Sequence, residues 1–282
     1  MKKFRTLLLS TTPFFLAFAM QFVAVYYLLF IAAIFLFVIA PIVQGTTYNE
    51  TDLFILTADM NFNTIASILF SVFCSALFAI WYYRSCGGDL KINVMKRFHL
   101  LEVLGIVLLV PGAQFMSSIV TSIVSTIFPN WLEDYMELME TAGLSGEIPV
   151  LMMIYSVLLA PISEEFIFRG VTLRLARRAF PFWIANIIQA LLFGIFHMNP
   201  LQGCYTFVIG LFLGYICEKG GTLYHAILFH LLFNLWGTTM SEFLVVEDVV
   251  LQGLIIIGGT ILGTFGGIFF LQKGGQCKAK LS

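Results

Sequence analysis

The sequence has few charged residues. Only 11% of its 282 residues are Asp, Glu, Lys or Arg, whereas 60% are hydrophobic and Phe alone occurs 30 times. Soluble chains carry about 25% charged residues. This composition excludes a disordered chain, and a net charge of −1 without a basic run excludes a nucleic-acid binder. The sequence therefore predicts a polytopic membrane protein with an all-α fold.

Cysteine is also scarce, and the sequence contains no CxxC motif. The spacing of the five cysteines offers no framework of disulfide pairs, which excludes a small disulfide-bonded scaffold. We expect reduced thiols without a chemical role at Cys74, Cys86, Cys204, Cys217 and Cys277.

Long apolar runs predict about eight membrane-spanning helices. A span needs about 20 mostly apolar residues to cross the hydrocarbon layer. No charged residue lies between Arg5 and Glu50, which is too long a run for a signal peptide and predicts a retained first span. The expected spans are 14–43, 64–83, 101–128, 149–168, 182–197, 203–217, 222–239 and 251–271.

The connecting segments predict the orientation of these spans. All 15 Lys and Arg lie in the amino-terminal tail, in segments 84–99 and 169–178, at Lys219 or in the carboxy-terminal tail. The intervening loops 44–63, 129–148 and 240–250 contain eleven acidic residues and no basic one. Because basic residues favour the cytoplasmic side, both termini are expected in the cytoplasm.

This pattern divides the chain into three parts. We expect amino-terminal spans with acidic outer loops at 1–148, a core of four spans at 149–240, and a last span with a basic tail at 241–282. Segment 131–140 is predicted to be an amphipathic surface helix. Glycines four apart predict close helix packing at Gly210/Gly214, Gly259/Gly263 and Gly263/Gly267. Hydrogen bonds between helices are expected from Ser118, Ser122 and Ser125.

Three polar motifs interrupt the apolar runs. In the first, Glu165 and Arg169 are four residues apart on one helical face, where they can form an ion pair. Glu164 is rotated about 100° away and is expected to point into a polar cavity. Charged residues inside a membrane are costly and mark functional sites by default. The alternative is an interfacial salt bridge, with Glu164 reaching the headgroups.

The second motif is Phe193 with His197, and the third is His230 with Asn234. A lone histidine near a helix end is often interfacial, and a His/Asn pair often joins two helices. However, a rise of about 1.5 Å per residue places Glu164, His197 and Asn234 about 20 Å from the inner surface. We therefore expect one site inside the membrane, opening toward the cytoplasm.

A carboxylate and imidazoles that converge in an apolar pocket can activate water as a general base. A second histidine and a carboxamide can donate hydrogen bonds to a developing oxyanion. These groups suit hydrolysis of an amide. Glu and His also bind zinc, so a metal held by Glu164, His197 and His230 is an equal possibility at this point.

The ordered motifs EExxxR (Glu164, Glu165, Arg169), FxxxH (Phe193, His197) and HxxxN (His230, Asn234) resemble those of the CPBP family. This family comprises the CAAX endopeptidases, also called type II CAAX prenyl proteases or the Abi family, together with bacteriocin-processing and immunity proteins. The resemblance extends over about 150–240.

The resemblance implies an intramembrane endopeptidase acting on a membrane-associated protein or peptide in a lipid bilayer. It implies that Glu164 and His197 activate water, that His230 and Asn234 form the oxyanion hole, and that Glu165 and Arg169 support the site. Family members have been described both as metalloproteases and as glutamate-type proteases, so the cofactor stays open. The short chain leads us to expect a bacterial plasma-membrane protein.

Two alternatives are not proteolytic: a bacteriocin self-immunity factor, or a transporter that uses the Glu/His cluster as an ion pathway. A carrier is expected to have deep acidic residues in both halves. The motif GxSG at 143–146 resembles that of rhomboid serine proteases, but it lies in an acidic loop and predicts a turn. No HExxH motif is present for a zinc protease.

Overall fold

The computed structural model describes residues 2–86, 98–145, 147–240 and 246–281, and every regular element within them is a helix. Six helices are long and apolar enough to cross a membrane. The predicted all-α membrane bundle is confirmed. The described helices are α1 (Lys2–Ile34), η1 (Phe35–Ile39), α2 (Ala40–Gln44), α3 (Glu50–Ala58), α4 (Met60–Ser85), α5 (Leu100–Ile127), α6 (Pro129–Thr141), α7 (Val150–Ile154), η3 (Tyr155–Leu159), α8 (Ala160–Glu165), η4 (Phe166–Thr172), α9 (Leu173–Arg177), α10 (Phe182–Phe196), α11 (Pro200–Gly220), α12 (Leu223–Thr239) and α13 (Val249–Leu281).

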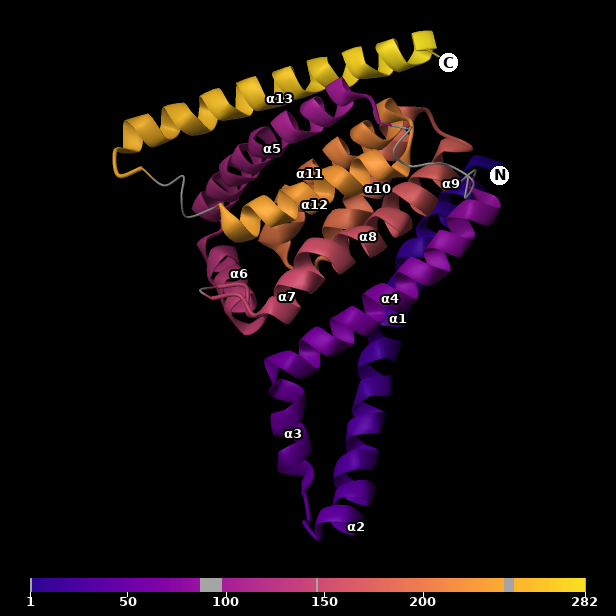
Figure 1. Ribbon diagram of the computed structural model, residues 1–282, viewed down its shortest axis with the longest axis vertical. Coiled ribbons are helices and arrows are strands. Elements are labelled where there is room, and N and C mark those ends of the chain that lie inside the picture. Colours follow the sequence, from indigo (N-terminus) through magenta and orange to yellow (C-terminus); the bar gives the residue numbers. More distant parts are fainter. Residues whose placement is uncertain (1, 87–97, 146, 241–245, 282) are drawn as a thin grey trace.

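Each of the eight predicted spans falls on a helix or on a continuous run of helices. Two are short: α10 has 15 residues and α12 has 17, or about 22 and 26 Å. In contrast, the apolar run Lys3–Gln44 has 42 residues, or about 63 Å, twice the hydrocarbon thickness. Its second half projects from the bundle together with α3 (Figure 1).

Two helices contain a widened turn directly before a proline. The π-helical segments η1 and η3 end at Ile39 and Leu159, and each is followed by an Ala-Pro pair, at Pro41 and Pro161. Proline has no N–H and its ring crowds the preceding turn, so the helix gives up its regular hydrogen bonds there. The second widened turn lies just before the predicted EExxxR motif.

Glycines bring several helices into close contact, as their spacing predicts. A Cβ on Gly112 would lie 2.7 Å from the Thr264 nitrogen, and a Cβ on Gly267 would lie 2.8 Å from the Gly105 carbonyl oxygen. The backbones of α13 and α5 are therefore in direct contact at these glycines. Gly210 of α11 approaches Ala190 of α10 in the same way, at 3.0 Å.

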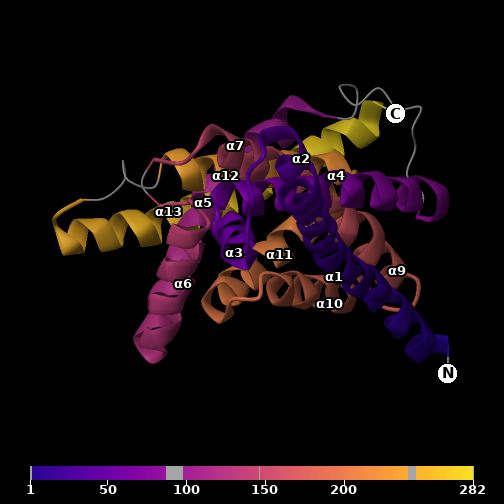
Figure 2. The same cartoon turned by 90° about the horizontal axis from the view of Figure 1, so that it is seen from below.

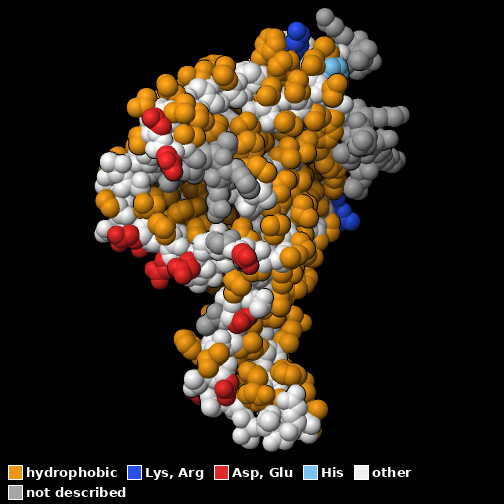
Figure 3. Space-filling model, turned by 60° about the vertical axis from the view of Figure 1, so that its left-hand side comes forward, with side chains coloured by type: hydrophobic (Ala, Val, Ile, Leu, Met, Phe, Trp, Pro, Cys, Tyr) orange, Lys and Arg blue, Asp and Glu red, His pale blue; other side chains and the backbone are white. Residues whose placement is uncertain are grey.

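The two chain termini lie at the same end of the bundle, as an even number of spans requires (Figure 1). Helix α6 lies at the edge of the bundle away from α1 (Figure 2). Acidic side chains gather on the face that includes α6 (Figure 3). We call this end of the bundle the acidic end. Its described acidic residues are Glu50, Asp52, Asp59, Glu133, Asp134, Glu137, Glu140, Glu147, Glu247 and Asp248.

The opposite end carries the described basic residues of the termini and of α9. The predicted cytoplasmic residues Lys91, Lys96 and Arg97 lie outside the described residues, as does the acidic Glu242.

Candidate active site

The EExxxR motif lies in the middle of the continuous helical run from α7 to α9. An Arg169 guanidinium nitrogen is 2.8 Å from Glu165 Oε1, and both side chains are fully buried. The predicted ion pair is therefore present, although Arg169 belongs to the π-helical segment η4. Such widened turns occur often at functional sites. Glu164 lies near the middle of the run Val150–Arg177, and its side chain is 14% exposed.

His230 of α12 lies between the two adjacent carboxylates. Its Nδ1 is 2.8 Å from Glu165 Oε1, and its Nε2 is 3.6 Å from Glu164 Oε2. Glu165 Oε1 thus accepts from both Arg169 and His230, which holds the imidazole in one orientation. Because Nδ1 donates to Glu165, Nε2 is the atom that can exchange a proton with Glu164.

His197 caps the carboxyl end of α10, and its Nδ1 is 2.9 Å from the carbonyl oxygen of Phe193. A carbonyl oxygen only accepts hydrogen bonds, so Nδ1 carries the hydrogen. The neutral ring then presents Nε2 as a proton acceptor. The next residue, Met198, has φ = +59°, a conformation that costs energy for a residue other than glycine. This turn directs the chain from α10 into α11.

The Phe193 ring links the parts of the cluster. The Arg169 guanidinium carbon lies 4.3 Å from the ring centroid, a cation–π contact. The His197 and His230 rings meet Phe193 edge-to-face at 4.8 and 5.9 Å. Among the contacts of the described residues, none joins His197 directly to Glu164. Their predicted partnership in activating water stays a prediction.

Asn234 lies one helical turn beyond His230, and its Nδ2 donates to the Ser156 carbonyl oxygen at 2.8 Å. The carboxamide lines a cavity of about 620 Å³ between α5, α6, α11 and α12. Tyr205 of α11 also lines this cavity. This cavity adjoins α6, at the acidic end, and the cytoplasmic opening expected from the sequence stays a prediction.

The cavity also corrects the expected role of the α5 serines. Ser118 donates to the Gln114 carbonyl and Ser125 to the Ser122 carbonyl, all within α5. Ser118, Ser122 and Ser125 line the cavity, and none of them bonds to another helix among the described residues, where the predicted interhelical hydrogen bonds are therefore missing. The motif alone could not distinguish a packed face from a cavity wall, because both favour small residues.

Sequence reasoning missed a layer of amides beneath the ion pair. Gln189 Nε2 donates to the Gly210 carbonyl oxygen at 2.8 Å, the same oxygen that accepts from Arg169 at 3.4 Å. Asn186 accepts from Gln189 and donates to the Leu211 carbonyl oxygen. Two amides three residues apart in an otherwise apolar run were the available signal. They fix α10 and α11 relative to Arg169.

A second buried Glu/His pair lies apart from this cluster. His225 Nε2 is 3.1 Å from Glu102 Oε2, and His225 Nδ1 is 2.6 Å from the Thr222 hydroxyl. The side chains of Glu102 and His225 are fully buried. The pair joins the start of α5 to the start of α12. Sequence analysis placed Glu102 at the edge of its span but did not consider His225.

The predicted metal ligands do not fit a zinc site. Both ring nitrogens of His230 face carboxylates, and His197 Nδ1 bonds to a backbone carbonyl. Within the described part of the chain, no three His, Cys, Asp or Glu side chains are placed to hold a metal together. A zinc site needs three or four converging ligands.

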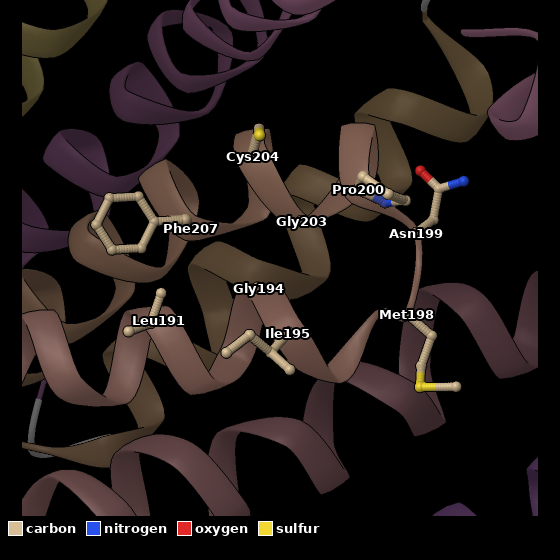
Figure 4. A pocket seen from close by; sticks show the side chains of 9 residues that line it. All are labelled: Leu191, Gly194, Ile195, Met198, Asn199, Pro200, Gly203, Cys204 and Phe207. Carbon is tan, nitrogen blue, oxygen red and sulfur yellow. The ribbon is translucent and has the colours of Figure 1, made fainter. Parts of the chain in front are cut away.

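Other surface features lie away from the cluster. A mostly apolar hollow of about 480 Å³ lies on the turn between α10 and α11 (Figure 4). Its lining includes Met198, Asn199 and Cys204, but not Glu164, His197, His230 or Asn234. The GxSG segment begins with Gly143 at φ = +69° in the turn after α6, as predicted, whereas Gly146 lies outside the described residues. All five cysteines are free.

Comparison with known proteins agrees with the motifs. Residues 146–236 match the family model of the type II CAAX prenyl endopeptidase Rce1-like proteins. No curated protein and no solved structure matches the chain significantly. The match covers the predicted motifs, and at the level of the family it supports a CAAX-type intramembrane protease. The family resemblance is thereby confirmed, and the long apolar helices make the chain an integral membrane protein.

Proposed function

We propose that this protein is an intramembrane endopeptidase that hydrolyses a peptide bond of a membrane-associated protein or peptide. The observation that carries the proposal is the position of His230 between Glu164 and Glu165, inside the segment that matches the CAAX endopeptidases. A carboxylate beside an imidazole in a water-poor site is suited to move protons during hydrolysis.

In the proposed reaction, Glu164 accepts a proton from a water molecule while the water oxygen bonds to the scissile carbonyl carbon. The carbonyl oxygen gains negative charge, and hydrogen bonds from Asn234 Nδ2 and from Nε2–H of the doubly protonated His230 imidazole stabilise it. The carbon–nitrogen bond then breaks, and the departing amine takes the proton that Glu164 received. His197 Nε2 orients the attacking water as a hydrogen-bond acceptor. Glu165 and Arg169 hold His230 in place.

The charge distribution supports an orientation with both termini in the cytoplasm. All basic residues of the chain lie in the tails or in the three segments expected on that side. The acidic end then faces outward. We place the protein in a bacterial plasma membrane.

The test compares the purified wild-type protein with Glu164→Gln in membranes that contain candidate peptides. Mass spectrometry should detect new peptide termini with the wild type and none with the variant. Equal cleavage by both proteins would contradict the role of Glu164. Cleavage by neither, across membrane and secreted peptides of the source cells, would favour a non-proteolytic immunity factor.

A further inference from the structure

The cavity that contains Asn234 has a different chemistry from the lipid-facing surface. Its volume is about 620 Å³, and hydroxyl or amide side chains make up a large part of its lining. A hollow is visible on the acidic face in Figure 3. If this cavity contacted only lipid tails, apolar side chains would be favoured in its lining. The lining hydroxyl residues of α5 are Ser117, Ser118, Thr121, Ser122 and Ser125.

These α5 hydroxyls form a row of hydrogen-bond acceptors. Ser118 and Ser125 donate their hydrogens to carbonyls of their own helix, so their oxygen lone pairs are the groups left for a ligand. Seven residues of helix separate the two, or about 10 Å. An extended peptide rises about 3.3 Å per residue, so about three peptide units, each with an N–H donor, span the same distance.

Asn234 is the one proposed reacting group in the cavity lining, which does not include Glu164, His197 or His230. Asn234 and Ser156 line the cavity and are hydrogen-bonded to each other, and His230 lies one turn before Asn234 on the same helix. Tyr205 of α11 lines the same cavity. A peptide lying along α5 would therefore bring its main chain to Asn234, one helical turn from His230.

One end of the cavity lies beneath α6, whose charged residues are all acidic. Leu132, Tyr135 and Met139 of α6 face the cavity, and Tyr135 contacts Tyr205 through their hydroxyls at 3.4 Å. Glu133 and Glu137 are exposed on the same helix. Loops 44–63, 129–148 and 240–250 contain no Lys or Arg, so a cationic segment is attracted to this end.

We propose that this cavity binds an extended, basic peptide segment that enters from the acidic end, and that the α5 hydroxyls pair with its main chain. The inference rests on the proposed endopeptidase function, since it names the substrate class of the same site. With the orientation given above, the substrate segment lies on the outer side of the membrane.

The test uses full-length Glu164→Gln protein and two pools of ten-residue peptides. Both pools share random apolar centres and a benzophenone photo-crosslinker, but one is flanked by Lys and the other by Glu. We expect at least tenfold more crosslinking with the Lys pool, located by mass spectrometry on α5, α6 or α11. The preference should fall severalfold in 0.5 M salt, because exposed charges are screened.

A matched pair of variants tests the hydroxyl row. Ser122→Leu, made in the Glu164→Gln background, fills the cavity wall and should reduce crosslinking about tenfold. Thr126→Leu, one turn further along α5 and outside the cavity lining, should not reduce it. No crosslinking, equal crosslinking of both pools, or insensitivity to Ser122→Leu would each overturn the inference.

Cleavage by the wild type then separates the two proposals. If the Lys pool crosslinks to the cavity of Glu164→Gln but the wild type leaves it uncut, the binding inference stands and the endopeptidase function fails. If the wild type cuts both pools equally and Ser122→Leu has no effect, the function stands and the basic-peptide cavity is wrong.

Discussion

Helix α12 holds two buried histidines, His225 and His230, and each pairs with a glutamate of another helix. In the first pair, Glu102 and His225 are 3.1 Å apart, both are fully buried, and Thr222 contacts the second ring nitrogen. In the second pair, Glu164 is 3.6 Å from His230 and retains 14% exposure of its side chain. The residue types are the same, but their surroundings differ.

The difference lies in what each pair can reach. The Glu102–His225 pair is fully buried, with Gly220 of α11 packed against His225 and Gly274 of α13 packed against Glu102. A buried pair of this kind fixes helices relative to one another. The Glu164–His230 pair lies one turn from Asn234, which lines a cavity, and has a second carboxylate to orient its histidine. A buried Glu/His pair is therefore suited to chemistry only where a cavity adjoins it.

The strongest test of this comparison replaces each glutamate by its amide. Glu164→Gln removes the proposed base, and we expect peptide cleavage to fall by about 10³-fold with an unchanged melting temperature. Glu102→Gln should retain the turnover rate but lower the free energy of unfolding by about 1–3 kcal/mol, because a buried hydrogen-bond partner is altered. Both are measured by peptide cleavage and thermal unfolding in the same detergent. The comparison fails if Glu102→Gln is the variant that loses turnover.

The second test removes one partner of each of two ion pairs. Arg169→Ala leaves the buried Glu165 without its cation, so we expect a loss of about 3–5 kcal/mol of stability together with loss of activity. Arg177→Ala breaks the pair with Glu218, whose side chains are 36% and 37% exposed, and should cost about 0–1 kcal/mol. Thermal unfolding in detergent measures both. Equal melting of Arg169→Ala and the wild type would contradict a supporting role for the buried pair.

The helices and the Glu165–Arg169 pair could be predicted from the sequence because both depend on local patterns. An apolar run defines a span, and a four-residue spacing puts two side chains on one face. The contact between His230 and Glu165 could not be predicted in this way, since it depends on how α12 packs against α8. The same holds for Gln189, whose partner is a carbonyl of α11.

The α5 serines show where local patterns mislead. A row of small hydroxyl residues can pack against a helix or line a cavity, and only the position of α6 decides between the two. Likewise, helix lengths gave the depth of Glu164 from one surface, but they could not show from which end a cavity reaches Asn234.

The third test concerns the proposed oxyanion donor. Asn234→Ala removes one hydrogen-bond donor, and we expect kcat to fall by about 10²–10³-fold with little change in KM. Thr239→Ala, on the same helix but with its hydroxyl bonded to the Leu235 carbonyl, serves as the control and should keep its kcat. A change confined to KM would assign Asn234 to substrate binding and not to the transition state.

The smallest effect is expected from metal removal. His230 is held by two carboxylates, and the cluster does not present three ligands to one metal, so its proton-transfer groups are all supplied by side chains. Treatment of the purified protein with a zinc chelator, followed by dialysis, should change peptide cleavage less than twofold. Elemental analysis of the same sample shows whether a metal was present before treatment. If cleavage fell more than tenfold and added zinc restored it, the Glu164–His230 pair would have to rearrange around a metal. The difference from the Glu102–His225 pair would then be metal ligation and not access to the cavity.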